Sequence, residues 1–175
     1  TFGQLPIQEF SQSGRGESVD ISEDGKSVVV GTNAGITLYD RELESQIWSY
    51  GSDTRAVSIS PNGEYIAGVN EDEIYLFGNE NSYPLWTYEF PYDYGSDSIL
   101  SLEFTDNGEK LILSSSYNIS LFDVSNGDLV WYHSDGFFFT AGIYDYDVSA
   151  DGQYVAVCSS SGDTIVYDSR FVGND

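Results

Sequence analysis

The chain has 175 residues, enough for one domain with a buried core, and 15% of them are aromatic. Its 29 acidic residues against 6 Lys and Arg give a formal net charge of -23. This balance argues against nucleic acid and anionic membrane surfaces as partners, because contacts with phosphate need basic side chains. No apolar run is long enough for membrane insertion.

The chain contains no methionine. A translation start is therefore missing, which leaves a mature product of N-terminal processing or an excerpt of a longer protein. We favour an extracellular or cell-surface protein whose signal peptide has been removed. The acidity suits solubility by self-repulsion, a basic partner or a salty medium, and we associate it with extracellular or salt-adapted archaeal proteins.

Residues 1–16 contain one apolar segment, Leu5–Phe10, which we expect to form a strand. Four tight turns follow at intervals of about 40 residues. Each turn reads Ser or Thr, any residue, Asp or Asn, then Gly, and the four end at Gly25, Gly63, Gly108 and Gly152.

Two further sequence features follow each turn in the same order, and we call these repeated features marks. An apolar strand ends in an aromatic residue, and the first three copies then place a tryptophan at a fixed distance. The aromatic residues are Tyr39, Phe77, Phe122 and Tyr167, and the tryptophans are Trp48, Trp86 and Trp131. Marks in fixed order at a regular period indicate an internal repeat.

One whole repeat lies between Leu102 and Trp131, where four short apolar stretches are separated by turns and predict four antiparallel strands. Such a sheet has two apolar faces, which only a stack of like sheets can bury. We therefore predict an all-β fold, a β-propeller with four four-stranded antiparallel blades in a single domain. The blades are expected at about 17–50, 55–90, 99–133 and 144–175.

These motifs resemble the blade repeats of WD-repeat and quinoprotein-like propellers. The stretch Asp123–Trp131, DVSNGDLVW, is similar to the tryptophan-docking motif of the pyrroloquinoline quinone family, although Ser125 and Asn126 stand near the position of the family's Thr. The resemblance implies that the tryptophans pack between adjacent blades. It specifies the fold well and the function poorly.

The last repeat stops before its expected tryptophan strand. The segment Leu5–Phe10 is a candidate to complete that blade and close the ring, and it could equally belong to a preceding blade. A four-bladed unit within one chain, an eight-bladed ring of two chains and an excerpt of a larger propeller all satisfy the repeats.

Two linkers are longer than the others and carry aromatic residues: Glu89–Ile99 and His133–Asp145. In the resembled propellers such linkers share a face with the loops between second and third strands, which here contain Asn33, Asn70–Glu73, Tyr117 and Asp163. We predict a binding surface there, formed by Tyr92, Tyr94, Tyr117, His133, Phe137, Phe138 and Phe139. Plugging the mouth of a narrow ring is the alternative role for the three phenylalanines.

The sequence gives little evidence for a catalytic or metal site. His133 is the sole histidine, and we expect it to be an exposed loop residue and not part of a catalytic triad. No catalytic residue is predicted and no cofactor is assigned, with calcium at a surface carboxylate cluster such as Asn70–Glu73 left open. Asp145, Asp147, Ser149 and Asp151 mimic the opening of a calcium loop, but the glutamate such a loop requires is replaced by Ala156, so no metal site is assigned. Cys158 lies in an alternating strand, where we expect a structural thiol.

We therefore predict a non-enzymatic binding or assembly module that contacts protein or glycan, or further copies of itself. Asn118 begins an N-glycosylation sequon. The alternatives are a structural subunit of an extracellular filament or surface layer, and a fragment of a quinoprotein-like enzyme.

Overall fold

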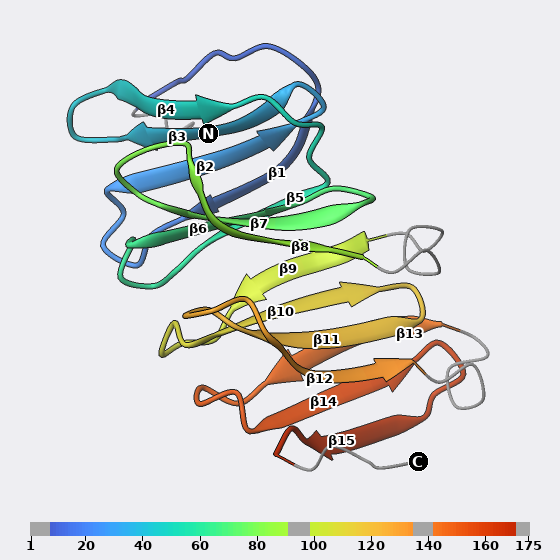
Figure 1. The fold of residues 1–175 in the computed structure, drawn as a ribbon. Coiled ribbons are helices and arrows are strands. Elements are labelled where there is room, and N and C mark those ends of the chain that lie inside the picture. Colours follow the sequence, from blue (N-terminus) through green and yellow to red (C-terminus); the bar gives the residue numbers. More distant parts are fainter. Residues whose placement is uncertain (1–7, 91–98, 135–141, 171–175) are drawn as a thin grey trace, which may run out of the picture.

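The computed structural model describes residues 8–90, 99–134 and 142–170, and every helix-or-strand element in these ranges is a β-strand (Figure 1). The strands form four antiparallel sheets, each built in chain order. The first sheet contains β1 (Gly16–Ile21), β2 (Ser27–Thr32), β3 (Gly35–Asp40) and β4 (Ser45–Tyr50), and the second β5 (Ala56–Ile59), β6 (Tyr65–Val69), β7 (Glu73–Gly78) and β8 (Pro84–Glu89). The third contains β9 (Ile99–Phe104), β10 (Lys110–Ser115), β11 (Asn118–Asp123) and β12 (Leu129–Ser134), and the fourth β13 (Ile143–Val148), β14 (Tyr154–Ser159) and β15 (Thr164–Asp168).

The predicted all-β propeller architecture is confirmed. The first three sheets have four strands each, and the fourth has three in the part of the chain that is described. Within these described residues there is no helix long and apolar enough to cross a membrane.

The repeated turn owes its geometry to its hydroxyl residue. Ser60 Oγ accepts a hydrogen bond from Tyr65 N at 2.9 Å and donates one to Asn62 Oδ1 at 2.8 Å. Gly63 closes the turn with φ of 71°, a left-handed conformation that glycine adopts without steric cost. The same bonds recur at Ser22, Thr105 and Ser149.

Buried side chains fill the three spaces between neighbouring sheets, which we call the seams. Val29 and Leu38 face Ile66 and Phe77 across the first seam. The second seam joins residues such as Leu76 and Leu111, and the third joins residues such as Leu121 and Val157. Each internal sheet is therefore apolar on both faces, as the repeat predicted.

The tryptophans dock on the next sheet. Trp48 Nε1 donates a hydrogen bond to Asn79 O at 3.1 Å, and Trp86 Nε1 donates one to Val124 O at 2.8 Å. A Cβ atom added at Gly127 would lie 2.8 Å from the Trp86 ring, so the glycine of the docking motif makes room for it. The predicted packing between blades is confirmed.

The stack of sheets is open, with the first and fourth sheets at opposite ends (Figure 1). The described part of the N-terminal segment does not join the fourth sheet of its own chain. From Gln8 onward it lies on the first sheet, where the Phe10 ring stacks on Tyr39 with centroids 4.4 Å apart and Gln8 Nε2 donates a hydrogen bond to Arg41 O at 2.9 Å. Of the two alternatives left open for this segment, completion of the last blade of the same chain is therefore wrong for the described residues.

Candidate functional site on the loop face

The turns between second and third strands lie beside the linkers that enter or leave the sheets. Backbone hydrogen bonds join Thr54 N to Thr32 O at 3.1 Å, Phe90 N to Asp72 O at 2.8 Å and Ile143 N to Ser116 O at 2.7 Å. We call this end of the sheets the loop face and the opposite end the turn face. The described members of the predicted group, Asn33, Asn70–Glu73, Tyr117 and Asp163, lie at this end of their respective sheets.

The predicted aromatic surface is described only in part. Tyr92, Tyr94, Phe137, Phe138 and Phe139 lie outside the described residues, so their role in binding stays a prediction. Tyr117 follows β10, and 46% of its surface is exposed. It provides an exposed aromatic side chain on the loop face.

The predicted glycosylation site is buried in the folded chain. Asn118 begins β11, is 5% exposed, and its Oδ1 accepts a hydrogen bond from Tyr132 Oη at 3.0 Å. Glycosylation stays a prediction, and a glycan on this side chain would have to be attached before the sheet forms.

His133 lies in β12, not in a loop, so the expectation of a solvent-exposed loop histidine is wrong. Its half-buried ring stacks at 12° on that of Trp131, and Tyr167 Oη lies 2.9 Å from its Nε2. Tyr50 and Tyr88 occupy the same position in the earlier sheets and pack on Phe77 and Phe122, with centroids 5.0 and 4.9 Å apart. An aromatic ring two residues after each tryptophan is thus a fourth repeat mark, which the sequence contains but which our sequence analysis did not use.

A polar cluster on the loop face of the second sheet is held by Asn70. Its Nδ2 donates to Ser52 Oγ and Tyr75 Oη, both at 3.2 Å, while its Oδ1 accepts from the backbone of Glu73 at 2.8 Å. Burial, together with the hydrogen bond that Tyr75 donates to Glu73, raises the pKa of Tyr75 to about 12. The phenol therefore stays neutral at physiological pH, and these hydrogen bonds hold the turn between β6 and β7.

Charge on the described loop face is mostly negative. Arg55 Nη2 is 2.5 Å from Glu71 Oε1 and 3.9 Å from Asp53 Oδ2, and the hydrogen bond to Glu71 is the main cause that raises the pKa of Arg55. Asp72 and Asp163 are exposed on the same face. The surface therefore offers carboxylates and Tyr117 to a ligand.

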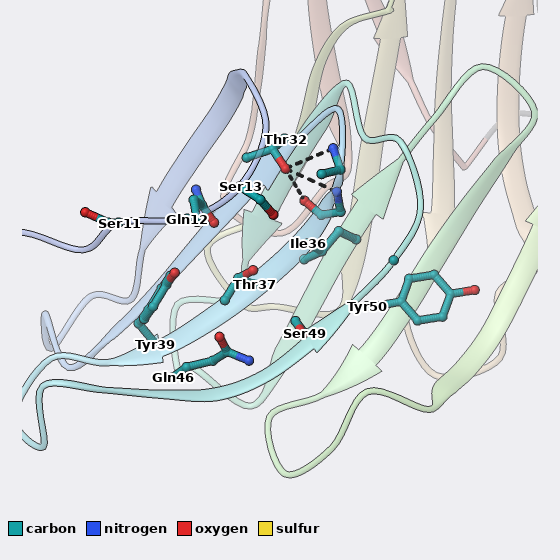
Figure 2. A pocket seen from close by; sticks show the side chains of 13 residues that line it. Ser11, Gln12, Ser13, Thr32, Ile36, Thr37, Tyr39, Gln46, Ser49 and Tyr50 are labelled. Carbon is teal, nitrogen blue, oxygen red and sulfur yellow. Dashed lines mark hydrogen bonds between the residues drawn. The ribbon is translucent and has the colours of Figure 1, made fainter.

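A shallow pocket of about 190 Å³ lies between residues 11–13 and strands β3 and β4 (Figure 2). Hydroxyl and amide groups from Ser13, Thr37, Gln46 and Ser49 line it, and Thr32 Oγ1 closes the adjoining turn by accepting from Ala34 N and Gly35 N at 3.1 Å. Small-molecule sites usually enclose about 300–1,000 Å³. This hollow is below that range.

On the turn face, a second hollow of about 410 Å³ lies between the second and third sheets, next to an ion pair. Lys110 Nζ and Asp123 Oδ2 lie 2.7 Å apart across the β10–β11 pair. This hydrogen bond is the main cause that holds the pKa of Asp123 below its ordinary value of 3.8. The pair anchors the sheet edge.

The carboxylates that mimic a calcium loop have structural roles. Asp151 Oδ1 accepts hydrogen bonds from Ser149 Oγ and Gln153 N at 2.7 and 3.0 Å, which fixes the turn. Asp145 and Asp147 each accept the N–H of the following residue. Across residues 8–90, 99–134 and 142–170, no three His, Cys, Asp or Glu side chains gather as metal ligands do.

Comparison with known proteins identifies the fold alone. No family model and no curated protein matches this sequence. Among solved structures, the chain is similar to the β-propeller domain of Cps50 (Swd1) from Myceliophteria thermophila, with a TM-score of 0.64 and 14% identity. The match covers 86% of this chain and 50% of that one, so the chain spans about half the length of the solved propeller.

Proposed function

We propose that the protein is a non-enzymatic interaction module whose loop face holds a protein segment rich in basic residues. The observation that carries this proposal is the exposed Tyr117 on a face where the exposed acidic residues Asp53, Glu71, Asp72 and Asp163 outnumber the exposed Arg15. Exposed aromatic rings with surrounding charge suit protein contacts, and a Lys or Arg side chain can stack on tyrosine while it pairs with carboxylates.

The fold supports this proposal because rigid sheets hold loops in fixed positions, an arrangement that binding proteins use often. The net charge of -23 adds long-range attraction for a basic partner. Glycan binding and an extracellular or cell-surface location stay predictions from the sequence.

A second candidate function is that of a structural subunit. Both ends of the open stack expose apolar strand residues, with Val19 and Ile21 in β1 at 67% and 53% exposure and Val166 in β15 at 64%. Exposed apolar sheet faces are typical of surfaces that another sheet covers.

The binding proposal is tested with an oligolysine peptide as the probe and its affinity measured by fluorescence anisotropy at several salt concentrations. We expect Tyr117→Ala combined with Glu71→Gln and Asp72→Asn to weaken binding at least about tenfold, since a cation–π contact and two ion pairs are lost.

The matched control carries Glu23→Gln and Asp106→Asn, which remove the same charge from exposed positions on the turn face. The affinity of this control for the peptide should fall about twofold at most, because only its net charge has changed. Equal loss in both variants would show that the peptide senses only total charge and that the loop face is not the site.

A further inference from the structure

The tryptophan contacts across the first two seams share a pattern that also applies to the N-terminal segment. The tryptophan of one sheet donates to the carbonyl just after the third strand of the next sheet, and its ring packs near the aromatic residue that precedes that strand's end. Trp48 does so with Asn79 O and with Phe77, whose centroid is 5.1 Å away. Trp86 makes the same hydrogen bond to Val124 O.

Gln8 and Phe10 reproduce both halves of this contact on the first sheet. Arg41, whose carbonyl accepts from Gln8 Nε2, directly follows β3, as Asn79 follows β7. Tyr39, on which Phe10 stacks, holds the position of Phe77. The segment from Gln8 to Ser13 therefore occupies the place of an outermost strand belonging to a preceding sheet.

The fourth sheet lacks that outermost strand in the described part of the chain, because its order ends at β15. Its outward face also has the composition of a seam. Val166 holds the position of Leu38, Leu76 and Leu121, which are at most 1% exposed at the three internal seams, whereas Val166 is 64% exposed.

The outward face of the first sheet shows the complementary pattern. Val19 and Ile21 hold the positions of Val57 and Ile59, which are 4% and 5% exposed at the first seam. The end faces therefore carry the two different halves of one seam, each without the other half.

A polar contact also crosses the first seam, but the end faces do not reproduce it. At the first seam Asp20 Oδ2 accepts from Ile59 N at 2.9 Å and from Ser58 Oγ at 3.1 Å, on the inner strand of the next sheet. Asp147 holds the position of Asp20 in the fourth sheet and is exposed. Opposite a first sheet, Asp147 would face Asp20, which holds the position of Ser58 and cannot donate, and Ile21 N, which already donates to Asp20 Oδ1 at 2.8 Å. The contact between copies therefore depends on the apolar residues of the two end faces.

We propose that two copies of this chain close one eight-bladed ring. The fourth sheet of each copy packs on the first sheet of the other, and the segment from Gln8 to Ser13 lies beside β15 of the other copy as its fourth strand. Four sheets from each copy give eight blades, which fall within the known range. A two-fold axis uses the same seam twice, so the assembly closes.

This ring also accounts for the pocket in Figure 2. The hollow between residues 11–13 and strands β3 and β4 lies on the outward face of the first sheet, along the seam that a second copy completes. A second copy would cover this hollow.

A cysteine pair tests the contact directly. At the first seam, a Cβ atom added at Gly31 would lie 2.9 Å from Val57 Cγ1. At the end faces, Cys158 in the fourth sheet holds the position of Gly31, and Val19 in the first sheet holds the position of Val57. Cys158 is the sole cysteine of the chain. The Val19→Cys variant of the full chain should therefore form a disulfide from each copy to the other when oxidised glutathione accepts the electrons.

We expect most of the Val19→Cys protein to migrate on non-reducing gels at twice the 19.3 kDa chain mass, and to return to single chains on reduction. The control is Leu85→Cys, which places a thiol in the outer strand of the second sheet, at a position that is 59% exposed. This variant should migrate largely as single chains on the gel. Single chains with Val19→Cys, equal cross-linking in both variants, or a ladder of longer polymers would each overturn the closed two-copy ring.

Discussion

At the scale of single residues, the fold depends on a few positions where the backbone and a neighbouring sheet act together. Gly127 is one of them. Its φ of 76° lies in the left-handed region, and an added Cβ would meet the Trp86 ring from the preceding sheet at 2.8 Å. The docking-motif glycine is therefore required both by its own turn and by the seam.

Gly127→Ala is expected to lower the free energy of unfolding by about 1–2 kcal/mol through the backbone and by about 1–3 kcal/mol more through overpacking of Trp86. Denaturant unfolding followed by tryptophan fluorescence measures the loss. Gly25→Ala is the control, since Gly25 has φ of 68° but no atom within 4 Å of an added Cβ. Equal losses in the two variants would contradict the contact with Trp86.

At the scale of strands and sheets, the turns and strands could be predicted from the sequence, because they depend on residues close together in the chain. The hydroxyl of Ser60 and the left-handed Gly63 define a turn within a few residues, so four turns and the strands around them were correctly predicted. The docking of Trp48 and Trp86 also followed from their spacing through the family resemblance.

The contacts of His133 and of Asn118 could not be predicted from local chemistry, because each involves a residue from another strand, although the repeat position that His133 shares with Tyr50 and Tyr88 does indicate a packed ring. Tyr167, which contacts His133, comes from the next sheet, and Tyr132, which contacts Asn118, comes from the neighbouring strand. The position of Phe10 on Tyr39 is equally non-local, and the sequence left open which sheet the N-terminal segment joins.

The cross-strand pair of Lys110 and Asp123 gives a pH-dependent prediction. The hydrogen bond from Lys110 lowers the pKa of Asp123 in the folded state. The ion pair therefore stabilises the fold fully at pH values above 3.8, the ordinary pKa of Asp, and this stabilisation is lost as the pH falls through the lowered pKa. Asp123→Asn should therefore destabilise the protein by about 1 kcal/mol at neutral pH and by progressively less below pH 3.8.

Thermal unfolding at pH 7 and at acidic pH measures this difference between Asp123→Asn and the unmodified chain. Asp40→Asn is the control, because Asp40 holds the same position in the first sheet but pairs with Ser27 in place of a lysine. A destabilisation by Asp123→Asn that persists unchanged in acid would contradict the role of the ion pair.

At the scale of the whole molecule, four sheets form an open stack whose ends carry the two halves of one seam. Burial of both apolar end faces favours association, whereas the net charge of -23 on each copy opposes it. Because salt screens repulsion between exposed charges but leaves apolar burial in place, association should strengthen as the salt concentration rises.

The most direct test is the molecular mass of the full chain in solution, measured by light scattering over a series of salt concentrations. The two-copy ring predicts a species of twice 19.3 kDa whose fraction increases with the salt concentration, and no larger assembly. A mass of 19.3 kDa at every salt concentration would contradict it.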